Sequence, residues 1–298
     1  MINVNERLQK ALTDLNPWWK SRDFEVEYRP REIYPLIKKY QPLRQIIALT
    51  GLRRVGKTTL LKKVIDDLLT EGIQPAHILF FSYDDFQDVE IEEVLHAYQG
   101  LLPIDIAKDK CYLFFDEIQK LASWQEKAKR VYDTFPRLKM YISGSESLLL
   151  LKEANESLAG RIFTFKVELL SFQEYLGFKG LSFPNPALYK KEIMRELDQF
   201  YQSGGFPELI AITDREIAKR YFRETIIEKL IYKDIPQLFK IENPSVLEAI
   251  LNIIISNPGQ LMDLQSLSRE IGISRQTLAS YLSYLEKAFL VIKLYNFS

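Results

Sequence analysis

The stretch IIALTGLRRVGKTTLLKKVIDDLL, residues 46–69, carries the strongest signal in the sequence. Residues 51–58 within it match the pattern G-x-x-x-x-G-K-[ST] in full. The glycines of this pattern let backbone N–H groups curl around phosphate oxygens, because no Cβ stands in the way. An apolar run precedes the pattern and an amphipathic helical pattern follows it, which is the context that such a loop needs. The stretch therefore predicts a phosphate-binding loop between a strand and a helix.

The positions of this loop have expected roles toward a nucleotide, ATP or ADP. Lys57 would reach the β- and γ-phosphates, and the Thr58 hydroxyl would hold Mg²⁺. The helix that begins there adds the positive end of its dipole. Arg53 and Arg54 could contact the nucleotide, a lid or a second subunit, or simply keep the loop solvated. The predicted nucleotide-binding residues of the loop are Gly51, Leu52, Arg53, Arg54, Val55, Gly56, Lys57, Thr58 and Thr59.

Short apolar runs alternate with helical patterns between about residues 45 and 168. The runs are rich in β-branched and aromatic residues, which is typical of strands in a parallel sheet covered on both faces. Two of the helices between them begin with capping-box spacing, one at Ser123 with Glu126 and one at Ser171 with Glu174. The pattern predicts an α/β domain with a five-stranded parallel sheet. The strands are expected at 46–49, 77–82, 111–115, 138–143 and 161–167.

A second motif, CYLFFDEIQK at residues 111–120, places two carboxylates at the end of an apolar strand. Asp116 is positioned to hold the water shell of Mg²⁺. Glu117 follows it and is positioned to polarise a water for attack on the γ-phosphate. Taken alone, an Asp-Glu pair could merely cap the next segment, but beside the phosphate-binding loop it indicates a catalytic pair.

A third strand end, YISGSES at residues 141–147, would lie between these two motifs. A polar side chain there could orient the attacking water. Ser145 is the first choice for this role and Ser143 is the second. The alternative is that the Ser-Gly-Ser sequence only makes a turn into a helix.

The segments GLRRVGKTT, YLFFDE and YISGSES together resemble the motifs of AAA+ ATPases, in particular the predicted prokaryotic, archaeal-type ATPases related to the STAND and Orc-like branches. The resemblance covers nearly the whole chain. It implies a P-loop NTPase fold of the AAA+ type, followed by a helical lid and a winged helix-turn-helix domain, with ATP and Mg²⁺ as ligands. Four further segments resemble the same group: NPWW (16–19), LAGR (158–161), LLSFQEYL (169–176) and GGFPE (204–208).

The resemblance also implies roles by position. Pro30 and Arg31, in the segment RPRE, resemble an adenine-side motif, and Pro207 resembles the proline with which a lid packs near the adenine. Arg161 opens the last strand and resembles an arginine finger, which would act on the γ-phosphate bound by a neighbouring subunit. The alternatives are turns punctuated by proline and glycine, and a solvated surface arginine.

The C-terminal segment 264–290 has a helix-turn-helix layout, with a turn at Gly272 and a capping serine at Ser274. Residues 241–298 hold four basic and five acidic side chains, which is weak electrostatics for binding a duplex. DNA and a protein are therefore both open as partners. The candidate DNA contacts are Arg275, Gln276 and Thr277.

These motifs predict four parts of the chain. They are an N-terminal segment with the adenine-side motif (1–40), the P-loop ATPase domain (41–180), the helical lid (181–245) and a winged-helix-like domain (246–298). The resemblance leaves open that the winged-helix-like domain continues beyond Ser298.

Composition excludes several classes of protein. Forty basic residues offset forty acidic ones, so no net charge draws the whole protein to nucleic acid or to a membrane. The single cysteine, Cys111, rules out an intramolecular disulfide and suits a reducing compartment. The first ten residues lack the layout of a signal peptide, and the apolar stretches are too short to span a bilayer. We therefore expect a cytoplasmic protein that does not insert into membranes.

Two functions fit these observations. The first is a Mg²⁺-dependent ATPase that couples its nucleotide state to movement of the lid and the winged helix. The alternative is a nucleotide-state switch or DNA-binding regulator with little turnover. Glu117 favours the ATPase, because a pure sensor has no need of a water-activating carboxylate. The expected partners are ATP, DNA or a protein at the winged helix, and further copies of the chain reached by an arginine finger.

Overall fold

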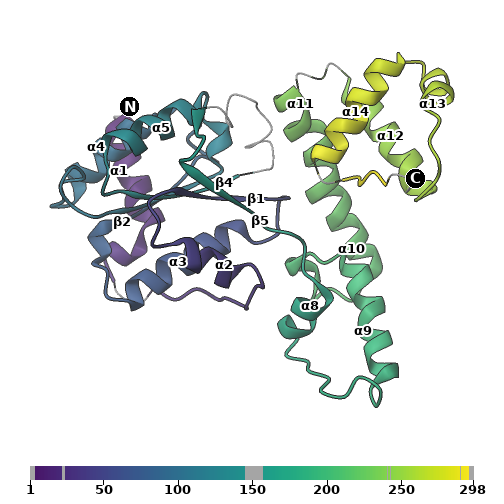
Figure 1. The fold of residues 1–298 in the computed structure, drawn as a ribbon, viewed down its shortest axis with the longest axis horizontal. Helices are drawn as coiled ribbons and strands as arrows, with labels where there is room; N and C mark the ends of the chain where they lie inside the picture. The colour runs from purple at the N-terminus through teal and green to yellow at the C-terminus, as the bar shows by residue number, and fades with distance from the viewer. Residues whose placement is uncertain are drawn as a thin grey trace. The chain divides into compact units, whose positions relative to one another are not determined.

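The computed structural model describes residues 4–21, 24–144, 157–239, 241, 243–288 and 290–294 (Figure 1). The chain divides into two compact units, Met1–Ile210 and Ala211–Ser298. The first unit holds the phosphate-binding loop and all of the predicted strands, and the second unit is helical.

A five-stranded sheet forms the centre of the first unit, and its strand order is β2-β3-β4-β1-β5. All four neighbouring pairs are parallel, so the carboxyl ends of the strands meet at one edge of the sheet. The five predicted strands are confirmed, and β4 lies between β1 and β3 as expected. Their bounds are β1 Ile46–Thr50, β2 Ile78–Ser82, β3 Tyr112–Asp116, β4 Lys139–Gly144 and β5 Ile162–Lys166.

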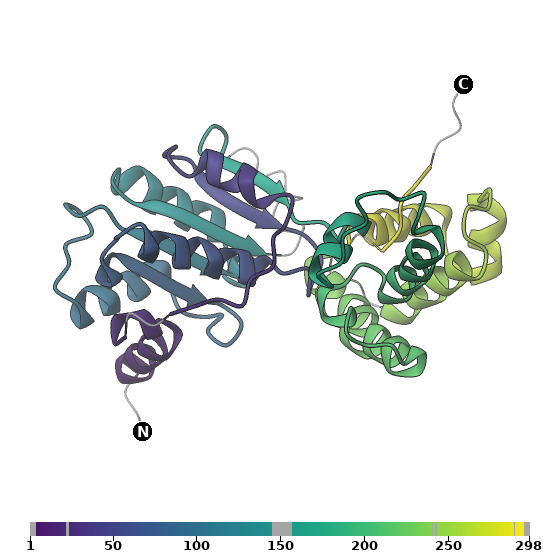
Figure 2. The same cartoon turned by 90° about the horizontal axis from the view of Figure 1, so that it is seen from below.

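Helices cover both faces of this sheet, because side chains along each strand point alternately to either face. On one face, Ile46 and Ala48 of β1 pack into the same core as Leu12 and Val94. On the other face, Phe114 stacks on Tyr141 with 4.6 Å between ring centroids. Figure 2 views the sheet from the side of α2 and α3. Figure 1 shows α1 (Val4–Leu15), α4 (Ile91–Leu101) and α5 (Trp124–Thr134) on one face, and α2 (Tyr34–Tyr40) and α3 (Lys57–Thr70) on the other.

One of the two predicted capping boxes is confirmed. The Ser171 hydroxyl accepts from the Glu174 N–H at 3.0 Å, and the Glu174 carboxylate accepts from the Ser171 N–H at 3.0 Å, where α8 (Phe172–Phe178) begins. The other predicted capping box, at Ser123, is wrong. Helix α5 does begin at Trp124, but Ser123 has a φ of 51° and its side chain makes no capping bond. Ser123 has a left-handed backbone, whereas a capping serine needs an extended one. The spacing of Ser123 and Glu126 in the sequence does not reveal this difference.

The described residues of the first unit also form one long helix and four short helical turns. The turn at Pro207 matters for the candidate site, because it brings the GGFPE segment to the phosphate-binding loop. The bounds are α9 Lys190–Ser203, η1 Pro17–Trp19, η2 Pro75–His77, η3 Ile118–Lys120 and η4 Pro207–Leu209.

The second unit is a set of helices around its own apolar core, in which Leu247, Leu278 and Leu285 are buried. The predicted helix-turn-helix is present: Gly272 has a φ of 78° in the turn, and the Ser274 hydroxyl accepts from the Thr277 N–H. The segment FLVIKLYNF, residues 289–297, would be a strand of the wing in the expected winged-helix-like domain; its described residues 290–294 are not in a strand. The elements are α10 Arg215–Tyr221, the π-helical turns η5 Phe222–Ile227 and η6 Leu230–Asp234, α11 Ile235–Phe239, α12 Pro244–Ser256, α13 Leu264–Ile271 and α14 Arg275–Lys287.

The NPWW segment closes the open edge of β2, which has no strand on its outer side. An edge strand exposes unpaired N–H and C=O groups. The side chain of Asn16, which is fully buried, donates to the Phe80 carbonyl at 2.8 Å and accepts from the Phe80 N–H at 2.6 Å. The indoles of Trp18 and Trp19 both donate to the Ile78 carbonyl. The segment therefore completes the hydrogen bonding that a sixth strand would supply.

We expect Asn16→Ala to lower the free energy of unfolding of the first unit by about 2–4 kcal/mol, because it leaves two buried backbone groups of Phe80 unpaired. Urea unfolding followed by tryptophan fluorescence measures this, since the three tryptophans all lie in this unit. Asn185→Ala, at an exposed position, is the control and should stay within about 0.5 kcal/mol of the parent. Equal losses in the two variants would contradict the edge-closing role.

Candidate functional site

The phosphate-binding loop joins β1 to α3, and its backbone requires glycine at its start. Gly51 has a φ of 145°, and a Cβ there would lie 2.3 Å from the carbonyl oxygen of Val167, which follows β5. Gly56 has a φ of 97° and precedes the first turn of α3. Arg54 is left-handed as well, with a φ of 65°. The loop is therefore wound tightly against the neighbouring strand, with the N-terminus of α3 at its end.

Lys57 is folded over this loop. Its ammonium group donates to the carbonyl oxygens of Gly51 at 3.1 Å and Leu52 at 2.8 Å, and the residue is 5% exposed. A lysine ammonium can exchange such neutral acceptors for phosphate oxygens, because an anionic acceptor makes the stronger bond. The phosphate contact of Lys57 stays a prediction.

Asp116, at the end of β3, is the central carboxylate of the site. One of its oxygens accepts from the Thr58 hydroxyl at 2.7 Å, and the other accepts from the Ser143 hydroxyl of β4. Burial raises the pKa of the Asp116 carboxyl, the neighbouring charge of Glu117 adds to this, and the hydrogen bonds from Ser143 and Thr58 oppose it. The Thr58 hydroxyl and the Asp116 carboxylate form a set of hard oxygen donors that fits Mg²⁺.

Glu117 follows Asp116 on a left-handed turn, with a φ of 52°, which directs its side chain away from the line of the strand. Its N–H donates to the Ser143 hydroxyl at 3.4 Å, and its carboxylate accepts from the Gln119 side-chain amide at 2.7 Å. Ser143, the second choice for a water-orienting residue, therefore contacts both carboxylate residues of the motif. Ser145, the first choice, lies outside the described residues.

Lys57, Thr58 and Glu117 line a hollow of about 360 Å³, which we call the loop hollow. A hollow of this size is at the lower end of the range for small-molecule sites. Glu208 and Asp84 line it too, and neither was among the predicted site residues. The lining residues are Arg53, Arg54, Gly56, Lys57, Thr58, Thr59, Asp84, Glu117, Pro207 and Glu208.

Arg54 explains how Glu208 joins the site. Its guanidinium contacts the Glu208 carboxylate at 2.9 Å, with both side chains nearly half exposed. The pair was not predicted from the sequence, because its two residues lie far apart along the chain. The charge of Glu208 beside Pro207 in GGFPE was the available indication. Asp84 is ion-paired with Lys120 at the mouth of the hollow. Arg54 thus contacts a segment far along the chain.

Arg31 lies beneath the loop, where it does not line the hollow. Its guanidinium donates to the Glu174 carboxylate at 2.9 Å, to the Val55 carbonyl at 2.7 Å and to the Glu168 carbonyl at 2.7 Å. The side chains of Arg31 and Glu174 are 5% and 7% exposed. Arg31 therefore holds the loop from behind, and neither it nor the exposed Pro30 lines the hollow.

Arg161 lies at the amino ends of the strands, whereas the loop lies at their carboxyl ends. It precedes β5, its carbonyl accepts from the Ile46 N–H at the start of β1, and its guanidinium pairs with Asp133 at 2.9 Å. The structure therefore does not bring Arg161 to the loop hollow of its own chain.

The three candidate DNA contacts lie in the second unit. Arg275 and Gln276 are exposed at the start of α14, and Thr277 bonds the Ser274 hydroxyl at 2.8 Å. In the described part of the chain, no group of three or more His, Cys, Asp and Glu side chains is arranged to hold a metal. No helix of the described ranges has the length and apolar character needed to cross a membrane.

We expect Arg31→Ala to lower the free energy of unfolding of the first unit by about 3–5 kcal/mol, because it leaves the buried Glu174 carboxylate without its cation. Urea unfolding followed by tryptophan fluorescence measures the change. Arg29→Ala removes an exposed arginine two positions away, and it should cost less than about 1 kcal/mol. A loss in Arg31→Ala no larger than that of Arg29→Ala would contradict the supporting role.

Comparison with known families matches residues 43–176 to the family described as AAA domain. Residues 194–298 match a domain of unknown function, DUF8612. The first match contains the loop, both carboxylates of the Asp116 motif and the five strands of the sheet.

Two curated relatives are uncharacterized proteins. One, from Methanocaldococcus jannaschii, is 30% identical over 287 residues, which is 93% of this chain and 60% of that protein. Another, from Haemophilus influenzae, is 27% identical over 255 residues, or 83% of this chain and 62% of that protein. The chain thus spans about three fifths of the length of these relatives.

Among solved structures, the fold is similar to that of a Walker-type ATPase of Pyrococcus abyssi. The TM-score is 0.54 at 18% identity, with 90% of this chain and 93% of that chain covered. At this identity the likeness concerns the fold. Residues 43–176 therefore match the AAA domain model, and the α/β fold of the chain is similar to that of a Walker-type ATPase.

Proposed function

We propose that this chain is a Mg²⁺-dependent ATPase of the AAA+ type, converting ATP and water to ADP and phosphate. The observation that carries the proposal is the Asp116 carboxylate, which accepts hydrogen bonds from Thr58 of the loop and Ser143 of β4. The next residue, Glu117, lines the loop hollow together with Thr58. A site that only held an anion would gain nothing from two carboxylates beside its lysine, because like charges repel.

The loop binds the triphosphate. Backbone N–H groups of residues 51–59 and the N-terminus of α3 surround the phosphates, and the Lys57 ammonium moves from the carbonyls of Gly51 and Leu52 to the β- and γ-phosphate oxygens. Thr58 and Asp116 hold Mg²⁺. When bound, this ion neutralises charge on the β- and γ-phosphates.

Glu117 acts on the attacking water. Its carboxylate accepts a proton as the water oxygen bonds the γ-phosphorus, and the bond from that phosphorus to the β–γ bridging oxygen breaks to release ADP. Ser143 holds the backbone of Glu117 and the side chain of Asp116 in register. Ser145, one residue beyond Gly144, is proposed to orient the water as well.

The segment around Pro207 couples the site to the rest of the chain. Pro207 is proposed to pack near the adenine as part of a helical lid at residues 181–245, with Pro30 and Arg31 on the adenine side. The Arg54–Glu208 pair supports this, because an incoming triphosphate competes with the Glu208 carboxylate for Arg54. Nucleotide binding then loosens one contact between the loop and the lid.

A neighbouring subunit is proposed to complete the site with Arg161. The position of Arg161 at the far edge of the sheet supports an action in trans, because the residue is remote from its own loop. The Asp133 pair would have to open for the guanidinium to reach a γ-phosphate.

A nucleotide-state switch with little turnover is the second candidate. The contact between the Gln119 amide and the Glu117 carboxylate favours it, because an amide donor on that carboxylate competes with the water for the same oxygen. In such a protein bound ATP would act as a structural ligand.

We expect Glu117→Gln to lower ATP turnover at least about a hundredfold while ATP binding persists, because the amide cannot accept the proton from water. Phosphate release measures turnover, and equilibrium titration with ATP measures binding. Glu126→Gln, which removes the same charge from an exposed site on α5, is the control and should keep parental turnover. If parent and Glu117→Gln share the same negligible turnover and bind ATP tightly, the chain is a switch.

The α13–α14 pair is proposed as the contact for DNA, within a winged-helix-like domain at residues 246–298, with a protein partner as the alternative. The exposed Arg275 and Gln276 at the start of α14 support this.

We expect duplex DNA to raise ATP turnover in the phosphate-release assay, and Arg275→Ala to remove most of that rise. Lys287→Gln, at the other end of α14, should retain it. A DNA effect equal in the two variants, or none in the parent, would leave the protein partner as the interpretation.

A further inference from the structure

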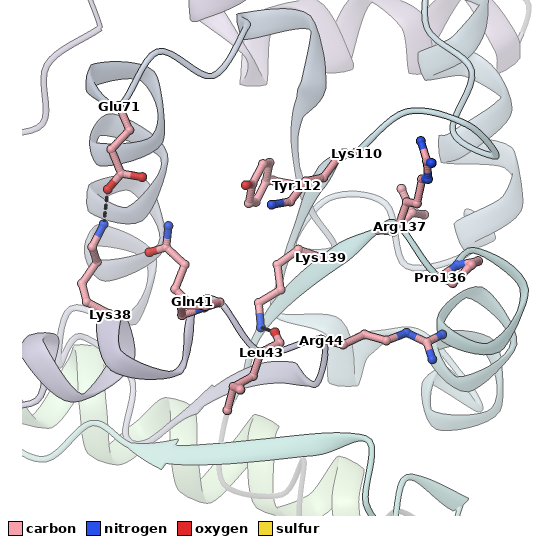
Figure 3. A pocket seen from close by; sticks show the side chains of 12 residues that line it. Lys38, Gln41, Leu43, Arg44, Glu71, Lys110, Tyr112, Pro136, Arg137 and Lys139 are labelled. Atoms are coloured by element: carbon pink, nitrogen blue, oxygen red, sulfur yellow. Dashed lines mark hydrogen bonds and ion pairs between the residues drawn. The ribbon is translucent and has the colours of Figure 1, made fainter.

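A second and larger hollow, of about 700 Å³, lies at the amino ends of the strands (Figure 3). We call it the amino-edge hollow. Figure 3 shows Lys38 and Glu71 on one side of it, Arg44 and Arg137 on the other, and Lys139, Lys110 and Tyr112 between them. The remaining lining residues are Gln41, Pro42, Leu43, Pro136 and Leu138.

The topology separates this hollow from the loop hollow. Residues 41–44 precede β1, Lys110 precedes β3, and Lys139 is the first residue of β4. The phosphate-binding loop and Asp116 instead follow the carboxyl ends of β1 and β3. Because these strands are parallel and paired in register, the two hollows lie at opposite edges of one sheet.

The amino-edge hollow gathers positive charge from three separate segments of the chain, at residues 38–44, 110 and 137–139. Its lining holds five cationic side chains and one carboxylate, in a protein whose forty basic and forty acidic residues balance. Bringing like charges together costs free energy unless a counter-charge is present. A concave surface lined by one sign of charge also concentrates ions of the opposite sign.

Lys38 already has acidic partners, since it pairs with Glu71 at 2.7 Å and Asp67 at 3.1 Å. Of the other four cations, Arg44 adds to the hydrogen bond from Arg161 in lowering the pKa of the nearby Asp133 carboxyl. Lys110, Arg137 and Lys139 contact only neutral groups in the described part of the chain, and Arg44 contacts neutral groups as well. Those contacts are Arg44 with the Tyr132 carbonyl and ring, Arg137 with the Lys108 carbonyl, Lys110 with the Tyr112 ring, and Lys139 with the Leu43 and Gln45 carbonyls and the Tyr141 ring.

Lys139 has a structural role of its own, because it binds the segment before β1 to β4 through two hydrogen bonds of 2.6 Å. That role does not require a charge to be buried, since a neutral donor would serve the same carbonyls. Burial lowers the pKa of Lys139 to about 8, and no neighbouring carboxylate counters this. An anion in the hollow would supply the missing counter-charge.

Gln41 adds a neutral polar group to the lining. Its side-chain oxygen is buried and accepts no hydrogen bond. A buried acceptor without a donor is costly, so a ligand that carries a hydroxyl or amine beside its anionic group would fit here. Tyr112, Leu43 and the two prolines offer apolar surface to the rest of such a molecule.

We propose that the amino-edge hollow is a binding site for a phosphorylated small molecule that carries hydroxyl groups. Lys110, Arg137 and Lys139 have no carboxylate partner among the described residues, and a dianionic phosphoryl group matches such a set of cations better than a single carboxylate does. Guanidinium groups also suit its oxygens. The volume fits a nucleoside or sugar phosphate, which share this chemistry. The concave shape favours such a molecule over a duplex, whose backbone needs an extended surface.

Calorimetric titration of the full chain with ribose 5-phosphate, and separately with AMP, tests the proposal. The variant Lys110→Gln/Arg137→Gln alters two exposed side chains, so it should fold like the parent. We expect it to weaken binding at least about tenfold, the effect of losing about 1.4 kcal/mol of charge-assisted contact. Lys190→Gln/Lys191→Gln, which removes two exposed cations from α9, should bind like the parent. Tighter binding of AMP would identify a nucleoside phosphate, and tighter binding of ribose 5-phosphate a sugar phosphate.

Lys57→Ala separates this site from the proposed ATPase site. It should weaken ATP binding at the loop and leave the binding of ribose 5-phosphate unchanged. The proposal is overturned if neither probe binds at about millimolar concentration, if the α9 control weakens binding equally, or if Lys57→Ala abolishes it. Binding of an acidic peptide or duplex DNA in place of both probes would also overturn it.

Discussion

The buried carboxylate of Asp116 is the constraint on which the candidate site depends. It lies at the end of β3, and it must share its two oxygens between Thr58, on the loop after β1, and Ser143, at the end of β4. Only a parallel sheet with β4 between β1 and β3 brings three such side chains together, because it places all three strand ends at one edge. The same arrangement leaves Glu117 on a left-handed turn facing the loop hollow.

The loop itself is shaped by groups that do not touch a ligand. Gly51 lies so close to the Val167 carbonyl that no side chain fits between them, and Arg31 binds the Val55 carbonyl from below. Arg31 in turn is held by Glu174, the residue that also completes the cap of α8. A single buried ion pair thus joins the N-terminal segment, the loop and α8. Such a pair fixes geometry more than it adds stability, because desolvation offsets most of its Coulomb energy.

The sheet has two chemically distinct edges. Its carboxyl edge combines a lysine, two carboxylates and helix N–H groups, which suits a triphosphate with a metal ion. Its amino edge gathers cations around a hollow with one carboxylate, Glu71. Helix α3 runs from one edge to the other, from Lys57 at the loop to Glu71 just beyond its end. Occupants of the two hollows would therefore contact opposite ends of the same helix.

The sequence by itself determined the five strands, the phosphate-binding loop and the Asp116–Glu117 pair, because these depend on local patterns: apolar runs, glycines at fixed spacing and charges at strand ends. It also favoured the helix-turn-helix around Gly272. Only the tertiary structure decided that Glu208 lines the loop hollow and that Arg31 lies beneath the loop. These positions depend on contacts between residues distant in sequence, which no local pattern encodes. The amino-edge hollow is of the same kind, because its cations come from three segments that only the sheet brings together.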